Sequence, residues 1–424
     1  MARLLYSLLF YLATPLIWLR LLWRARKQPE YLQHLGERYG FYPVPAKRPL
    51  IWLHAVSVGE TRAAAPLIDA LLYAYPAHAL LLTHMTPTGR ETGADYVAKY
   101  PGRLFQAYLP YDLPDACGRF LGHFQPDFGL LMETELWPNL IAAASLRRIP
   151  VALINARLSA RSQRGYARLD SLIRPALAAL SAVAAQTPAD AERLNALGAR
   201  NVRVCGNLKF DVTPDAEKLA LGATWKGALG KRPAWLVAST REGEEVLIVD
   251  ALEKANIPGV LLLLVPRHPQ RFAEVAALLR ERGLTLCRRS ENALPDAATQ
   301  VWLGDSMGEM AAYYAAADLA LIGGSLLPFG GQNLIEAAAC GCPVRVGPHT
   351  FNFAQATEDA IAGGAALRIA DANEAADTAR KLLEDGAALQ AMRNAALNFT
   401  QAHRGATQRT VALIEEITGP RTTD

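Results

Sequence analysis

Short apolar runs alternate with segments of helical periodicity along most of this chain, and the alternation begins again after a polar stretch. In the first half, the runs that predict strands are residues 50–54, 79–83, 104–109, 128–132, 151–155 and 183–186. After an irregular linker that ends near Pro233, the second series is 235–238, 260–265, 284–287, 301–303, 319–322 and 344–346. Strands that alternate with helices form parallel sheets covered by helices on both faces. The sequence therefore predicts an α/β protein with two doubly wound domains.

The N-terminal residues are more apolar than any other stretch of the chain. Residues 4–23 read LLYSLLFYLATPLIWLRLLW, which is about the length needed to cross a hydrocarbon core of roughly 30 Å. Basic residues gather at the C-terminal end of this segment, at Arg20, Arg24, Arg26 and Lys27. This excess predicts that the C-terminal side is cytoplasmic. No small-residue cleavage site follows, so a removed signal peptide is not expected. A helix lying in the membrane interface fits the segment as well as a spanning helix does.

Length and composition limit the remaining possibilities. A chain of 424 residues can form two or three domains with their own cores. We expect a membrane anchor in residues 1–27, a first domain in 28–212 and a second in 213–424, including an amphipathic helical tail without recognisable chemistry. The net charge of +4 is too balanced to predict a nucleic-acid partner. The five cysteines are scattered, which is typical of reduced thiols in a cytosolic protein and not of a zinc site.

Carboxylates follow two predicted strands of the first domain, at the strand ends where parallel sheets place functional residues. Glu60 ends the sequence HAVSVGE and begins a predicted helix. It could act as a general base, or it could only complement the helix dipole. Glu133 and Glu135 come immediately after the strand at 128–132, although Glu135 also suits the first turn of a helix.

Cations stand at other strand ends of the same domain. Arg90 ends the sequence TPTGR, in which Thr88 could cap the next helix. Three arginines follow the fifth strand, at positions 157, 161 and 164. They could bind phosphate or membrane headgroups. A solvated surface explains them equally well, and the residues alone favour that interpretation.

A glycine-rich stretch in the second domain, GGSLLPFGGQNLIEAAACG at 323–341, lies between a predicted strand and a predicted helix. Free backbone N–H groups and a helix N-terminus at such a point can bind an anion. Glu336, one turn into the helix, could accept hydrogen bonds from ribose hydroxyls. A simple loop with a capping residue is the alternative, because short glycine motifs are common. The glycines together with Glu336 favour a nucleotide site.

Three other loops of this domain carry polar groups at strand ends, namely 239–242, 266–269 and 304–310. Arg267 in the second of these loops suits an anionic ligand. The chain has neither the Walker lysine motif nor a G-x-G-x-x-G sequence at the first strand of either domain. This argues against kinases, ATPases and simple dehydrogenases. Two α/β domains with a nucleotide loop in the second indicate a transferase.

A set of motifs gives the chain a specific family resemblance. HAVSVGE, TPTG, ETELWPNL, NARLS, GNLKFD, STREGEE, VPRHPQRF, GDSMGEM, and GGSLLPFGGQN with GPHTFNF occur in this order. The chain thereby resembles the 3-deoxy-D-manno-octulosonic acid (Kdo) transferases of lipopolysaccharide assembly, glycosyltransferase family 30, from the membrane segment to about residue 355. The resemblance implies a GT-B glycosyltransferase, with two Rossmann-like domains facing a central cleft, on the cytoplasmic face of the bacterial inner membrane. It also implies transfer of Kdo from CMP-Kdo to the lipid A precursor lipid IVA.

The resemblance also assigns roles to residues. It implies that Glu60 is the general base, that Glu133 and Lys209 act on the transition state, and that Arg90 lies nearby. It implies CMP contacts at Pro266, Arg267, Met307, Gly308, Glu309, Asn333, Leu334, Ile335 and Glu336. The chain departs from the family at Gln332, where many members have histidine.

The implied mechanism is direct displacement at the anomeric carbon with inversion, through an oxocarbenium-like transition state. Arg267, Lys209 and helix N-termini would stabilise the leaving CMP in place of a metal ion. No Asp-x-Asp motif stands out, so no metal or other cofactor is expected. The expected partners are CMP-Kdo, the lipid A precursor and the membrane surface, without nucleic acid. A membrane-associated GT-B enzyme that uses a UDP-sugar and a non-catalytic sugar-nucleotide-binding protein are the alternatives.

Overall fold

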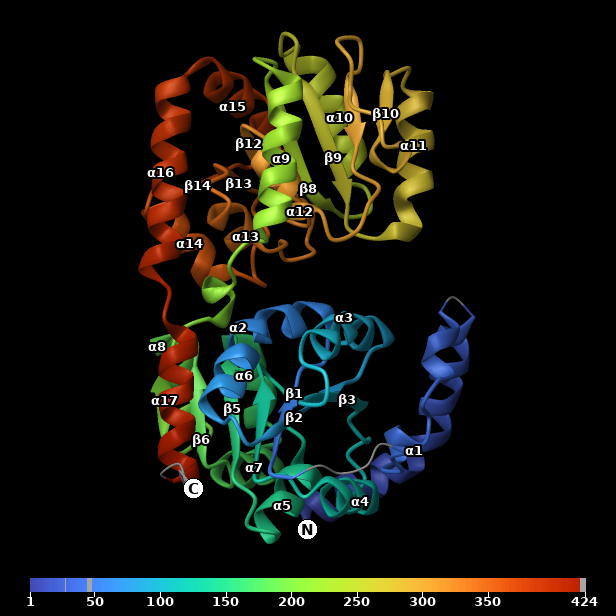
Figure 1. Ribbon diagram of the computed structural model, residues 1–424, viewed down its shortest axis with the longest axis vertical. Coiled ribbons are helices and arrows are strands. Elements are labelled where there is room, and N and C mark those ends of the chain that lie inside the picture. The colour runs from blue at the N-terminus through green and yellow to red at the C-terminus, as the bar shows by residue number, and fades with distance from the viewer. Residues whose placement is uncertain (27, 44–47, 420–424) are drawn as a thin grey trace. The chain divides into compact units, whose positions relative to one another are not determined.

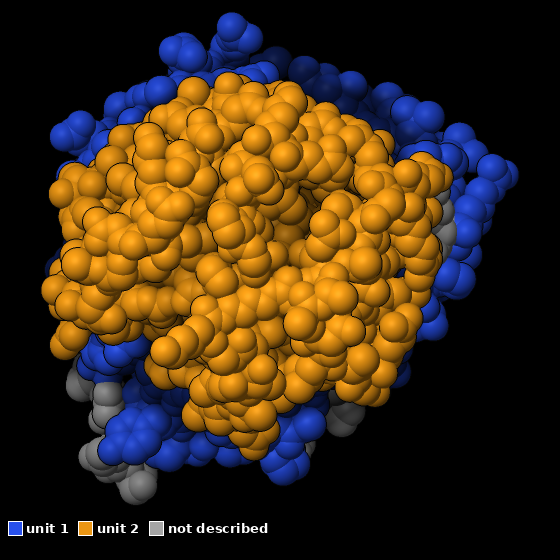
Figure 2. Space-filling model, turned by 90° about the horizontal axis from the view of Figure 1, so that it is seen from above, with its two compact units in different colours: residues 1–212, 404–424 blue, residues 213–403 orange. Residues whose placement is uncertain are grey.

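A computed structural model describes residues 1–26, 28–43 and 48–419, so Lys27 of the basic N-terminal group lies outside the described residues. The chain forms two compact units (Figures 1 and 2). Unit 1 comprises Met1–Val212 and Arg404–Asp424, and unit 2 comprises Thr213–His403. Each unit contains a seven-stranded parallel sheet, as the alternation of strands and helices predicts.

The sheet of unit 1 has the strand order β3-β2-β1-β4-β5-β6-β7. Its strands are β1 (Leu50–His54), β2 (Ala79–His84), β3 (Leu104–Tyr108), β4 (Phe128–Met132), β5 (Val151–Ala156), β6 (Ala182–Ala185) and β7 (Val202–Val204). Its helices are α1 (Ala2–Ala25), α2 (Val58–Ala74), α3 (Pro87–Lys99), α4 (Pro114–Phe124), α5 (Pro138–Leu146), α6 (Ala160–Ala167), α7 (Asp170–Ala178), α8 (Pro188–Ala196) and α17 (Ala406–Thr418), with the 3-10 turns η1 (Pro29–Leu32), η2 (Glu37–Tyr39) and η3 (Leu208–Asp211).

Proline begins four of these helices directly after a strand or loop. Pro87, Pro114, Pro138 and Pro188 each occupy the first helical position. Proline fits there because its fixed φ suits a helix and its missing N–H would have no partner within the helix. The sequence thus sets where each helix starts relative to the end of the strand before it.

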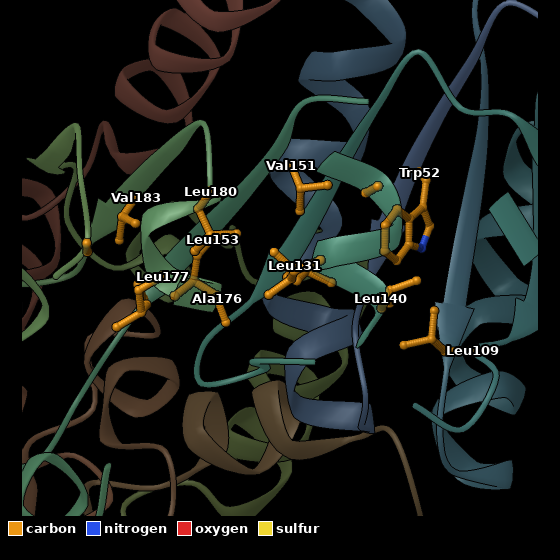
Figure 3. Close-up of a cluster of buried hydrophobic side chains, with 14 of the residues drawn as sticks. Trp52, Leu109, Leu131, Leu140, Val151, Leu153, Ala176, Leu177, Leu180 and Val183 are labelled. Atoms are coloured by element: carbon orange, nitrogen blue, oxygen red, sulfur yellow. The ribbon is translucent and has the colours of Figure 1, made fainter. Parts of the chain in front are cut away.

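Alternate residues of the strands in unit 1 enter two separate cores. Leu50 and Trp52 of β1 pack with residues of α4, α5, α7 and α8, and part of this core is drawn in Figure 3. Ile51 and Leu53 pack instead with α2 and α17. Helices therefore cover both faces of the sheet, and the carboxyl ends of the strands carry the polar residues.

The sheet of unit 2 has the order β10-β11-β9-β8-β12-β13-β14. Its strands are β8 (Ala234–Thr240), β9 (Leu261–Pro266), β10 (Leu286–Arg288), β11 (Val301–Leu303), β12 (Leu319–Ile322), β13 (Val344–Val346) and β14 (Ala366–Arg368). Its helices are α9 (Ala216–Leu229), α10 (Glu244–Ala255), α11 (Phe272–Glu281), α12 (Met310–Ala316), α13 (Leu334–Ala339), α14 (Ala354–Ala362), α15 (Ala372–Glu384) and α16 (Gly386–Ala402), with η4 (Pro269–Arg271) and η5 (Arg289–Glu291).

The last helix corrects the predicted domain limits. The sequence places all of 213–424 in the second domain, but the structure assigns Arg404–Asp424 to unit 1. Ala406, Leu413 and Ile414 of α17 are almost fully buried in the core that α2 also covers. The apolar side of this amphipathic helix completes a face of the first sheet.

Helix α1 is long and apolar enough to cross a membrane, and one of its sides is held by the rest of unit 1. Ser7 donates a hydrogen bond to Asn139 (3.1 Å), and Tyr11 donates one to Asp115 (2.6 Å). Trp18 stacks on a tyrosine of η2. The helix exposes large apolar side chains to the outside, namely Leu4, Leu5, Leu8, Leu9, Leu12, Leu16, Leu19, Leu22 and Trp23.

Candidate active site

Two glutamates flank the point where the strand order of unit 1 reverses. Glu60 lies in the first turn of α2, which follows β1, and Glu133 directly follows β4. Strands β1 and β4 are neighbours, and the helices that follow them, α2 and α5, cover opposite faces of the sheet. The carboxyl ends of two such strands form the crevice where doubly wound sheets bind ligands. The Oε2 atom of Glu60 accepts a hydrogen bond from the backbone N–H of Val56 (2.5 Å). The carboxylate thus closes its own loop as well as facing Glu133.

Glu133 is buried and held by two cations from distant parts of the chain. Its Oε1 accepts from Lys209 Nζ at 3.0 Å, and its Oε2 accepts from Arg157 Nε at 2.9 Å. The structure therefore brings together Glu133 and Lys209, which the family resemblance selects. The pairing of Arg157 with Glu133 was not predicted, because the sequence alone favours a solvated surface for this arginine. Its place directly after β5 parallels that of Glu133 after β4, and this is the signal that could have identified it.

The backbone at Glu133 is in the left-handed region, with φ of 56°. A residue with a Cβ atom seldom adopts this backbone conformation, because it costs about 1–3 kcal/mol. Residues in this conformation are concentrated at functional sites. The bonds to Lys209 and Arg157 hold the carboxylate in place against this cost. The strain at Glu133 therefore agrees with a functional position.

The two glutamates differ in charge because their surroundings differ. Burial, with a further contribution from the charge of Glu133, raises the pKa of Glu60 to about 8. Burial also acts to raise the pKa of Glu133, but Lys209 and Arg157 outweigh it and bring this pKa below its ordinary value. Burial raises the pKa of Glu135, in the same loop, to about 7. Glu133 is thus a fixed anion, whereas Glu60 exchanges a proton near neutral pH and is a strong base once ionised.

The raised pKa of Glu60 predicts that its ionisation destabilises the fold. Because the folded protein holds this proton more tightly than the unfolded chain does, stability falls as pH rises from about 4.5 to about 8. Glu60→Gln removes the cost of ionising a buried carboxyl, which lowers the free energy of unfolding by at most about 5 kcal/mol above pH 8. We expect the variant to melt at a higher temperature than the wild type at pH 8.5 and at nearly the same temperature at pH 4.5. An equal difference in melting temperature at both pH values would contradict this prediction. Glu416→Gln, at an exposed carboxylate, is the control.

Arg90 lies beside a different carboxylate. Its guanidinium contacts Glu37 at 2.6 Å and lies over the ring of Tyr108. Glu37 also accepts a hydrogen bond from the backbone N–H of Tyr108 (2.7 Å). The structure therefore shows Arg90 joining α3 to η2 and β3, and its part in the chemistry stays a prediction.

The residues selected for the nucleotide lie at the carboxyl ends of three strands of unit 2. Pro266 ends β9 and Arg267 follows it, residues 307–309 follow β11, and residues 333–336 follow β12. The strand order reverses between β8 and β12, which is again the usual place for a ligand.

The exposed and buried groups of this edge offer different contacts. Met307 is exposed, whereas Leu334 and Ile335 are buried, so only the main chain of the latter two can face a ligand. Glu309 is held by Arg289 at 2.9 Å. Gly308, with φ of 79°, lies between Met307 and Glu309 at the turn.

Arg267 and Glu336 share a buried neighbour. Burial raises the pKa of the Tyr314 hydroxyl well above its ordinary value, Glu336 raises it further, and Arg267 lowers it. Both charges therefore lie near the same hydroxyl, although one follows β9 and the other belongs to α13. The predicted roles of Arg267 toward a phosphate and of Glu336 toward a ribose stay predictions.

The predicted anion site at the first glycine pair is filled by the protein itself. The backbone N–H groups of Gly324 and Leu326 donate to the carboxylate of Glu244, at 2.6 and 3.0 Å, and so does that of Arg241, at 2.9 Å. Glu244 is only 1% exposed. The amides of Gly324 and Leu326 are therefore satisfied by a buried carboxylate, while the predicted contacts at residues 333–336 stay predictions. The sequence did not single out Glu244.

The second part of the glycine stretch forms the predicted helix, with Glu336 in its first turn. Helix α13 has only six residues, and the side chain of Asn333 caps it by accepting from Ile335 N (3.2 Å). The contact of this helix start with a nucleotide stays a prediction.

Comparison with known proteins gives the family. A family model described as "3-Deoxy-D-manno-octulosonic-acid transferase (kdotransferase)" matches residues 33–212. A 3-deoxy-D-manno-octulosonic acid transferase of Bordetella pertussis is 49% identical, over 99% of this chain and all of that protein. The protein of the same name from Haemophilus influenzae is 39% identical, over 98% of each chain.

A solved glycosyltransferase from Rickettsia africae superposes on this chain with a TM-score of 0.61. At 13% identity, over 89% of this chain and 99% of that one, this likeness shows a shared fold and confirms the predicted GT-B class. The identities of 49% and 39% to the two transferases extend over nearly the whole of each chain and therefore establish more than the fold. The chain belongs to the 3-deoxy-D-manno-octulosonic acid transferase family and is a glycosyltransferase.

Proposed function

We propose that the protein transfers Kdo from CMP-Kdo to a hydroxyl of the lipid A precursor lipid IVA during lipopolysaccharide biosynthesis, with inversion and with Glu60 as general base. The observation that carries the proposal is the pair of glutamates at the reversal point of unit 1. One of them is fixed as an anion by Lys209 and Arg157, and the other has a pKa of about 8.

The residues of the chain account for each part of the displacement. The acceptor oxygen forms a bond to the anomeric carbon while ionised Glu60 takes its proton. The bond from that carbon to the CMP phosphate oxygen breaks, and CMP leaves with the electron pair. The two positive charges of Lys209 and Arg157 exceed the single negative charge of Glu133 by one. This net positive charge favours binding of the negative groups of the donor. Arg267 provides positive charge for the phosphate at the edge of unit 2.

The position of α1 supports a lipid acceptor. The residues that hold α1 belong to the starts of α4 and α5, which follow β3 and β4. These contacts hold α1 beside the segments that follow β3 and β4, while its leucines stay exposed. Arg161 and Arg164 of α6 are exposed beyond the end of β5, where lipid phosphates could meet them.

We infer that α1 lies on the inner membrane surface and does not span it, because Ser7, Tyr11 and Trp18 are engaged by protein along one side. We expect the combined substitution of Leu8, Leu12 and Leu19 by serine to weaken sedimentation with anionic vesicles by about 1,000-fold or more, since burial of each leucine contributes about 1.5 kcal/mol or more. Tyr73→Ser, at an exposed ring of α2, is the control. A wild-type protein that stays in membranes after alkaline carbonate extraction would show that α1 spans them.

The test of the function is transfer of radiolabelled Kdo from CMP-Kdo, generated in situ, to purified lipid IVA by the wild-type protein. Inhibition by CMP and not by UDP supports the proposed donor, and the reverse pattern would indicate a UDP-sugar transferase. Activity that survives chelation of divalent cations supports a reaction without a metal. A folded protein that binds CMP without transferring Kdo would favour a binding protein.

The carboxylate under the glycine loop predicts an effect on donor binding. Glu244→Ala leaves four backbone N–H groups without this acceptor, and such groups cost about 1–3 kcal/mol each when buried. We expect the reshaped loop to weaken CMP binding by about 10- to 100-fold, measured by calorimetry. Glu242→Ala, at an exposed residue of the same loop, should bind CMP as the wild type does. Unchanged CMP affinity in the Glu244 variant would exclude this role.

A further inference from the structure

The C-terminal helix α17 contacts both elements that carry the proposed catalytic groups. Its Ala406, Leu413 and Ile414 share a core with Ala64 and Leu67 of α2, the helix that begins with Glu60. Its first turn and its Arg409 contact the segment around η3, which carries Lys209. A helix that the sequence places in the other domain therefore lies behind both sides of the active site.

Lys209 belongs to a very short element. The turn η3 consists of Leu208–Asp211, and an isolated turn of this length has little stability of its own. Its start is fixed by Asn155, whose side chain accepts from Leu208 N at 3.1 Å. The direction in which the Lys209 side chain leaves the turn therefore depends on what fixes the other end.

Asp211 fixes that other end. Its Oδ1 accepts from Gly405 N at 2.7 Å, and its Oδ2 accepts from Thr407 N at 2.5 Å. The residue that precedes α17 is glycine, which has no side chain to cap the helix. Asp211 supplies the cap from a position 194 residues earlier in the sequence, so the helix and the turn hold each other.

A second bond from the helix reaches the same segment from the strand side. Arg409 Nε donates to the carbonyl of Cys205 at 2.8 Å. Gly206, with φ of 90°, lies beneath this guanidinium, and a Cβ there would come within 2.9 Å of it. The chain between β7 and η3 is thus held along its length by α17.

We propose that α17 and Asp211 form a clamp that positions Lys209 against Glu133, which makes Asp211 a positioning residue for Kdo transfer. This inference rests on the proposed function, because it takes Lys209 and Glu133 as part of the catalytic machinery. Loss of the Asp211 carboxylate frees the end of η3 and lets the Lys209 ammonium move away from Glu133 Oε1. Asp211 itself need not touch either substrate.

The test is a double-mutant cycle on kcat with Asp211→Ala and Lys209→Ala. Displacement of a catalytic group by about 1 Å can cost up to about 100-fold, so we expect Asp211→Ala to lower kcat by about 10- to 100-fold. The KM for CMP-Kdo should change much less than kcat, since the proposed nucleotide residues belong to unit 2. Because Asp211 acts through Lys209, adding Asp211→Ala to Lys209→Ala should lower kcat no further.

Controls separate positioning from general stability. Glu416→Gln breaks an exposed ion pair between α17 and Arg203 and should leave kcat unchanged. CMP binding and thermal melting check that each variant folds. If Asp211→Ala does not fold, Asp211→Asn, which keeps one acceptor oxygen, is used in the same cycle.

Three results would overturn the proposal in distinguishable ways. Multiplicative losses in the double variant, with Lys209→Ala strongly impaired, would leave the proposed function intact and reject the clamp. Equal losses in the Glu416 and Asp211 variants would assign the effect to general stability of α17. Full transfer by Lys209→Ala would reject the catalytic role of Lys209 and the clamp together.

Discussion

Glu60→Gln is expected to lower kcat for Kdo transfer by about three orders of magnitude while CMP binding is retained. A positioned general base contributes about 10²- to 10⁴-fold, and glutamine has the size of glutamate without its basicity. The amide can still accept the hydrogen bond from Val56 N, so the loop between β1 and α2 should keep its shape. The loss therefore reports on proton transfer and not on folding.

The measurement is radiolabelled Kdo transfer over a range of donor concentrations, as a function of pH, for both proteins. In the wild type, kcat/KM should rise with pH and level off above about 8, because only ionised Glu60 accepts the proton. The residual activity of the variant should lack this dependence. If the variant transfers Kdo at the wild-type rate, Glu60 is not the base, and Glu133 becomes the candidate for that role.

Lys209→Ala should lower kcat by about 100- to 1,000-fold, the second large effect. Glu133 is only 5% exposed, and removal of one partner leaves a buried carboxylate short of compensating charge. Its pKa must rise, and the positive charge offered to the donor falls by one. Lys209→Arg, which restores the positive charge on a longer side chain, should recover part of the activity.

Arg157→Ala gives a matched comparison on the same carboxylate. The Arg157 side chain is 40% exposed and that of Lys209 is 16% exposed, so solvent screens the arginine more strongly. We expect the arginine variant to lose less activity than the lysine variant. A larger loss at Arg157 would show that its guanidinium, and not the ammonium, faces the transferred sugar.

Much of the fold follows from the sequence, because buried parallel strands need continuous apolar runs. Among the strands of the described residues, the edge strands β7 and β14 were not predicted. They are three residues long and contain the exposed Arg203 and Arg368, which pair with Glu416 of α17 and Glu358 of α14. A hydrophobic pattern cannot mark a strand that buries so little.

The site was predictable where chemistry depends on position along a strand, and not where it depends on contacts between distant segments. Glu60 and Glu133 stand at strand ends and were found from the residues, whereas Lys209 was found only by family resemblance. The burial of Glu244 under the glycine loop is a tertiary contact across 80 residues. Nothing local distinguishes such a carboxylate from an ordinary one in the first turn of a helix.

The return of α17 to unit 1 has a consequence for how the protein is made. Unit 2 is one continuous stretch and can complete its core as soon as it leaves the ribosome, but unit 1 is interrupted. Until α17 emerges, the apolar face formed by α2 stays uncovered and the turn that bears Lys209 lacks its anchor. Domains usually fold in the order of synthesis. Here the half that begins first is finished last, so the anchor of the turn that bears Lys209 is available only after all of unit 2 has been synthesised.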